Sequence, residues 1–90
     1  MTNPFDIELA LIEEERKRLD GMLDDALAQF ALVEEEMNAR MKTATPAQLQ
    51  ALMEERARIE DSLGIVALVD RLDELRARAA LIKSAAASAT

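Results

Sequence analysis

The 90-residue chain is 50% hydrophobic and 32% charged, and its only aromatic residues are two phenylalanines, a composition that predicts an all-α fold without a β-sheet. Its formal net charge of -7 comes from 18 Asp and Glu interspersed with 11 Lys and Arg, so nucleic acid is not an expected ligand. Because Cys and His are both absent, the chain lacks the usual zinc, iron-sulfur and copper ligands and the commonest general base, and we expect neither a cofactor nor catalysis.

The first residues predict neither a signal peptide nor a membrane anchor. No basic region precedes an apolar run, and no stretch of the chain approaches the roughly eighteen uncharged residues of a membrane span. We therefore expect a cytoplasmic protein without a membrane partner.

The first predicted helix spans residues 4–42. Asn3 can cap its amino end, and Pro4 suits the first helical position because an amide hydrogen there would have no helical partner. Apolar residues then recur with the alternating three- and four-residue spacing of a heptad, which indicates a coiled-coil-like seam. The apolar stripe consists of Phe5, Leu9, Ile12, Leu19, Leu23, Ala26, Phe30, Val33 and Met37.

A turn at residues 43–45 precedes a second predicted helix at residues 46–83. Thr45 can cap this helix, Pro46 takes its first position, and Gln48 lies where a capping box needs its side chain. Matched helix lengths and a short connection favour an antiparallel, coiled-coil-like helical hairpin that forms a single domain, residues 1–83. Residues 84–90 are rich in Ser and Ala without a larger apolar anchor, and we expect them to form a disordered tail.

The apolar stripe of the second helix changes phase at Gly64. The earlier stripe consists of Leu49, Leu52, Ile59, Leu63 and Val66. The later stripe consists of Ile65, Leu68, Leu72, Leu75, Ala79 and Ile82. A bend at Gly64 would keep one long helix, whereas a break there would divide the hairpin into three helices, and the pattern leaves both alternatives open.

Three arginines lie within the apolar stripes: Arg16, Arg40 and Arg56. Folding at the turn places Arg56 level with residues 35–36, which are both glutamate. The same register places Arg16 level with Asp70 and Asp73. Polar residues in a seam can specify the register of a coiled coil, while arginine can instead extend its charged end into water, and both interpretations stay open.

The segment 63–69 is apolar around its whole circumference, and a hairpin covers only one side of it. We therefore predict that this segment and the first-helix residues opposite it bind a partner chain. The alternative is a third helix that folds back from Gly64 and covers these residues internally. The predicted interface residues are Leu19, Met22, Leu23, Leu27, Leu63, Ile65, Val66, Leu68 and Val69.

Part of the second half of the chain resembles a known family. Residues 46–52, Pro-Ala-Gln-Leu-Gln-Ala-Leu, followed by Glu60 and by Leu-Gly-Ile at 63–65, resemble the second helix of the small co-chaperones of the type III secretion needle subunit, the YscE/EscE family. The resemblance covers about residues 45–70. It implies a short acidic helical hairpin that joins a tetratricopeptide-like chaperone and, with it, keeps the needle subunit soluble in the bacterial cytoplasm.

Taken together, the residues and the resemblance predict a non-enzymatic co-chaperone or adaptor that binds another helical protein. The resemblance implies that the partners are a tetratricopeptide-like chaperone and a secretion needle subunit. The alternative is a structural coiled-coil protein that binds itself as a dimeric four-helix bundle, which the sustained heptads of the first helix favour.

Overall fold

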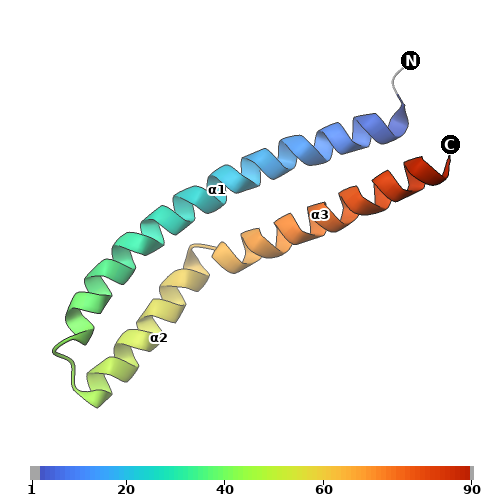
Figure 1. The fold of residues 1–90 in the computed structure, drawn as a ribbon. Coiled ribbons are helices and arrows are strands. Elements are labelled where there is room, and N and C mark those ends of the chain that lie inside the picture. Colours follow the sequence, from blue (N-terminus) through green and yellow to red (C-terminus); the bar gives the residue numbers. More distant parts are fainter. Residues whose placement is uncertain (1–2, 90) are drawn as a thin grey trace.

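A computed structural model describes residues 3–89, and all regular structure in this range is helical (Figure 1). Helix α1 spans Pro4–Met41, α2 spans Pro46–Ser62 and α3 spans Ile65–Ser88. The prediction of an all-α fold without strands is confirmed for these residues. Within the same range, no helix combines the length and the apolar character that crossing a bilayer requires.

The molecule is an elongated rod of 65 × 19 × 16 Å. Its radius of gyration is 19.7 Å, whereas a compact domain of this length has one of about 12 Å. Figure 1 shows α2 alongside the second half of α1 and α3 alongside its first half, so that both chain ends lie at the same end of the rod. Helix α3 continues away from α2, and the fold in which a third helix doubles back from Gly64 is therefore not the one adopted.

Both predicted amino-terminal caps are present. Asn3 Oδ1 accepts a hydrogen bond from the backbone amide of Phe5 at 2.9 Å. Thr45 Oγ1 accepts from the backbone amide of Gln48 at 3.2 Å, and Gln48 Oε1 accepts from the backbone amide of Thr45 at 3.0 Å. This reciprocal pair is a capping box, and it begins α2 at the residue that the sequence predicts.

Of the two alternatives left open for the second predicted helix, the structure has the break: the chain forms α2 and α3, which Leu63 and Gly64 separate. Gly64 has φ 72° and ψ 20°, the left-handed conformation that glycine adopts without steric cost from a Cβ. This conformation turns α3 relative to α2, and as a result Ile65 is buried against α1 while Val66 is exposed. The phase change in the apolar stripe follows from this rotation.

The end of the chain differs from the expected disordered tail. Helix α3 continues to Ser88, and the backbone amide of Ala89 donates to the Ala85 carbonyl oxygen at 3.0 Å. Alanine has the strongest helix propensity, so this alanine-rich segment extends α3 without a large apolar anchor. Residues 1, 2 and 90, which belong to the predicted domain and tail, lie outside the described residues.

The core is a single thin seam between α1 and the other two helices. Two groups of buried residues fill it, one between α1 and α3 and one near the α2–α3 connection. The first group is Ile12, Leu19, Leu75 and Ile82. The second group is Ala26, Phe30 and Ile65. Met37 of α1 is buried outside both groups. Helix α2 contributes no buried residue, and among the described residues no side chain is less than 2% exposed.

Candidate partner-binding surface

The predicted interface residues divide into two groups in the structure. One group lies in the seam between the helices, buried or half-buried, and comprises Leu19, Leu23, Leu63, Ile65 and Leu68. The other group is exposed and comprises Met22, Leu27, Val66 and Val69. The first group therefore holds the chain's own helices together, and the second group presents apolar surface to solvent.

Two ion pairs between α1 and α3 mark one side of the seam. Arg78 Nη2 donates to Glu8 Oε1 at 2.6 Å. Arg71 Nη2 donates to Glu15 Oε1 at 3.1 Å. Glu8, Glu15 and Met22 follow one another at intervals of seven residues, a spacing that keeps side chains on one side of a coiled coil. Met22 therefore lies on this ion-paired side.

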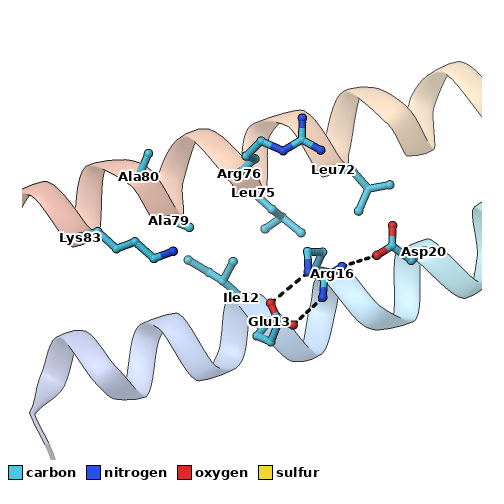
Figure 2. Close-up of a pocket in the computed structure, with 10 residues that line it drawn as sticks. All are labelled: Ile12, Glu13, Arg16, Asp20, Leu72, Leu75, Arg76, Ala79, Ala80 and Lys83. Atoms are coloured by element: carbon cyan, nitrogen blue, oxygen red, sulfur yellow. Dashed lines mark hydrogen bonds and ion pairs between the residues drawn. The ribbon is translucent and has the colours of Figure 1, made fainter.

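A groove between α1 and α3 marks the opposite side of the seam (Figure 2). Glu13 and Asp20 line it from α1, and Arg76 lines it from α3. Leu27 follows Asp20 by seven residues, and Val69 precedes Arg76 by seven residues. By the same heptad argument, Leu27 and Val69 lie on this second side, away from Met22.

Helix α2 adds two more exposed apolar residues to the second side. Arg56 on α2 donates from Nη2 to Glu34 Oε1 on α1 at 2.8 Å. Glu34 follows Leu27 by seven residues, so this ion pair lies on the side that carries Leu27. Leu49 and Met53 precede Arg56 by seven and three residues, which places them on its side of α2. Both are exposed.

We call this side the exposed apolar face. It comprises Leu27, Leu49, Met53 and Val69, with Val66 at its margin one helical turn before Val69. The sequence prediction missed Met53 and assigned Leu49 to the seam. The four-residue spacing of Leu49 and Met53 on α2 is the signal that could have identified them, because it places two apolar side chains on adjacent turns beside the seam.

A shallow groove on α2 forms part of this face. Met53, Arg56, Ala57 and Glu60 line it. The Glu60 side chain is half-buried and makes no ion pair within residues 3–89. Arg56 is already engaged by Glu34, and its guanidinium carbon lies 5.6 Å from the centre of the Phe30 ring. The groove therefore combines the apolar side chains of Met53 and Ala57 with one carboxylate, Glu60, that makes no ion pair in this range, because the arginine beside it is already paired with Glu34.

Arg16 forms no ion pair with Asp70 or Asp73, the residues that the sequence placed level with it. Arg16 instead forms ion pairs with Glu13 and Asp20 on its own helix (Figure 2). These carboxylates lie three and four residues away, where a helix brings side chains together, so the arginine is satisfied locally. The hydrogen bond from Arg16 lowers the pKa of Glu13 below its ordinary value.

The predicted partner of Arg56 is also shifted. The sequence placed residues 35–36 opposite Arg56, whereas the structure places Glu34 there. Glu36 is instead 2.7 Å from Arg40 on its own helix. The antiparallel direction of the two helices was enough to predict that Arg56 lies near residues 34–36. The rotation of α1 about its axis selects which of these three glutamates points at α2.

The described residues hold no group of three or more His, Cys, Asp or Glu side chains arranged to bind a metal ion. The surface of the described residues carries shallow grooves and exposed apolar side chains. No protein family, curated protein or solved structure matches this chain in the comparisons with known proteins.

Proposed function

We propose that this chain is a non-enzymatic adaptor or co-chaperone that binds a second helical protein through its exposed apolar face. In this proposal the chain acts in the cytoplasm as an antiparallel, coiled-coil-like hairpin with a break at Gly64. The binding mechanism is the packing of helix ridges into grooves, as between helices of one protein.

One observation carries the proposal: the chain exposes far more surface than a compact protein of its mass. Its solvent-accessible surface is 6723 Å², whereas a compact monomer of this mass exposes about 5200 Å². The excess, roughly 1500 Å², is larger than the area of about 800 Å² that each partner contributes to a standard interface. A second helical chain laid along the rod would cover this excess.

The exposed apolar face offers suitable contacts for such a partner. Leu27, Met53 and Val69 come from three different helices, so a partner helix along this face would contact the whole length of the rod's middle section. Leu27, Met53 and Val69 are already about half covered by the chain's own helices, so covering the rest of each contributes roughly half of the 1.5 to 3 kcal/mol for complete burial. Several such contacts together can support a complex.

The resemblance of residues 45–70 to the YscE/EscE co-chaperones supports a more specific proposal. The matching segment contains Leu49 and Glu60 of the exposed apolar face and the Leu-Gly-Ile sequence at the break. On this basis we propose a tetratricopeptide-like chaperone and a type III secretion needle subunit as partners. A tetratricopeptide repeat consists of paired helices, which can supply the helical surface that the exposed apolar face requires.

A dimeric four-helix bundle is the alternative, and the heptads of α1 favour it. The net charge of -7 acts against it, because two copies would bring like charges together. Sedimentation equilibrium of the purified chain separates the two functions. A stable dimer would support self-association, whereas a monomer would support the adaptor.

Affinity purification of the tagged chain from its source cells tests the adaptor directly. We expect the wild-type chain to retain a helical protein at a fixed ratio and Met53→Asp to lose it, with unchanged helicity by circular dichroism. Leu32→Asp is the matched control. Leu32 is 69% exposed, but on α1 it belongs neither to the series of Glu8, Glu15 and Met22 nor to the series of Asp20, Leu27 and Glu34, which flank the seam. Retention of the same protein by Met53→Asp would refute the proposed function.

A further inference from the structure

The exposed apolar face also indicates the chemistry of its occupant. Resting on the proposed function, we propose that the partner presents a basic amphipathic helix to this face, with an apolar stripe on Leu27 and Met53 and with Lys or Arg beside Asp24 and Glu60.

The charge of the chain is concentrated in one half of the rod. Residues 20–64, which form the turn end, contain ten acidic and four basic residues, a net charge of -6. All other residues together contain eight acidic and seven basic residues, a net charge of -1. The turn end contains Leu27, Leu49 and Met53, so most of the exposed apolar face lies in the acidic half.

Two carboxylates at this face make no ion pair with another residue among 3–89. Asp24 lies one helical turn before Leu27, and Glu60 follows Met53 by seven residues on α2. Neither forms an ion pair within residues 3–89, whereas Asp20 is held by Arg16 and Glu34 by Arg56. The carboxylates that remain available therefore flank the apolar contacts on both α1 and α2.

Glu60 makes a purely apolar partner unfavourable. Its side chain is half-buried in the groove that Met53, Arg56 and Ala57 also line, and Arg56 is already paired with Glu34. A partner that covers this groove would remove water from the carboxylate, and burial of a charge without a cation is costly. A Lys or Arg on the partner would remove that penalty, and an acidic residue would increase it.

A second copy of the chain is a poor source of these cations. Its turn end also carries a net charge of -6, and two of its four basic residues are engaged, Arg56 by Glu34 and Arg40 by Glu36. Contact between two turn ends would place like charges together at the interface. The charge distribution therefore favours a different, basic chain over self-association through this face.

Two synthetic peptides test the inference with the full chain. One is an eighteen-residue amphipathic helix of Leu and Lys, and the other has Glu in place of every Lys with the same Leu stripe. We expect the Lys peptide to bind at least tenfold more tightly by fluorescence anisotropy, with amide shifts in NMR spectra confined to the neighbourhood of Leu27, Met53 and Glu60. Equal binding of the two peptides, or dispersed shifts, would overturn the inference.

Two charge-matched double variants separate specific binding from general attraction to an acidic protein. Asp24→Lys with Glu60→Lys changes the face, while Asp6→Lys with Glu14→Lys changes exposed residues near the amino end of α1, away from the face, by the same charge. We expect the first pair of substitutions to lower the affinity for the Lys peptide at least tenfold and the second pair to lower it less than threefold. Equal losses would show nonspecific attraction and overturn the inference.

The result is independent of the test of the proposed function. If the Lys peptide fails to bind this face while Met53→Asp still loses the retained protein, the basic-helix inference is wrong and the adaptor function stands. If Met53→Asp retains that protein, the proposed function itself is wrong.

Discussion

Arg56 of α2 and Glu34 of α1 form an ion pair with 2.8 Å between Nη2 and Oε1, although 22 positions separate them in the sequence. The Arg56 guanidinium also lies over the Phe30 ring. Because α2 contributes no buried residue, this contact is one of the specific links that hold α2 against α1. It therefore reports the register of the two helices.

A double-mutant cycle of Arg56→Ala and Glu34→Ala tests this register. Both side chains are partly exposed, so we expect a coupling energy of about 0.2 to 1 kcal/mol from chemical denaturation. Glu36→Ala is the control, because Glu36 pairs with Arg40. The free-energy changes of Glu36→Ala and Arg56→Ala should therefore be additive. Coupling of Arg56 to Glu36 in place of Glu34 would contradict the register.

The capping box makes Thr45 a sensitive position in the turn. Thr45→Ala removes the acceptor for the Gln48 amide, and we expect a loss of about 0.5 to 2 kcal/mol, measured by thermal unfolding. Thr43→Ala is a suitable comparison, since the Thr43 hydroxyl donates only a long bond of 3.5 Å to the Arg40 carbonyl oxygen. If the two variants had the same melting temperature, the box would not stabilise α2.

The two glycines should respond in opposite directions to substitution by alanine. Gly21 lies inside α1, and an added Cβ would meet nothing within 4 Å, so Gly21→Ala should stabilise the chain by about 0.5 to 1 kcal/mol. Gly64 has a φ of +72°, so Gly64→Ala should destabilise it by about 1 to 2 kcal/mol. Denaturant midpoints measure both effects. Stabilisation by Gly64→Ala would indicate that α2 and α3 readily join as one helix.

Substitutions at two neighbouring residues at the start of α3 should distinguish an effect on folding from an effect on partner binding. Ile65 is 8% exposed and packs in the seam, so Ile65→Asp buries an unpaired carboxylate and should unfold the isolated chain. Val66 is 54% exposed, so Val66→Asp should keep its helicity by circular dichroism yet lose the partner.

Glu14→Lys is the control for this pair, because Glu14 is exposed and makes no ion pair among residues 3–89. It should change neither helicity nor partner binding. Loss of helicity in Val66→Asp would show that Val66 supports the fold, and the residue would then be removed from the proposed interface.

Local signals explain which helix boundaries were predictable. Asn3 with Pro4, and Thr45 with Gln48, act over three residues or fewer, so their geometry can be inferred before the fold is known. The heptad stripe of α1 was informative for a similar reason. Helical periodicity alone places Ile12, Leu19 and Ala26 on one side of α1, and the structure buries all three.

The sequence by itself determined the helical class, both amino-terminal caps and the apolar stripe, because these depend on residues within one or two helical turns. Only the tertiary structure decided the division of 46–83 at Gly64, since a glycine there can stay helical or turn left-handed, and packing of Ile65 against α1 selects the turn. Tertiary structure also decided which apolar residues stay exposed. That depends on the rotation of each helix about its own axis, which decides that Ile65 faces the seam and its neighbour Val66 faces solvent.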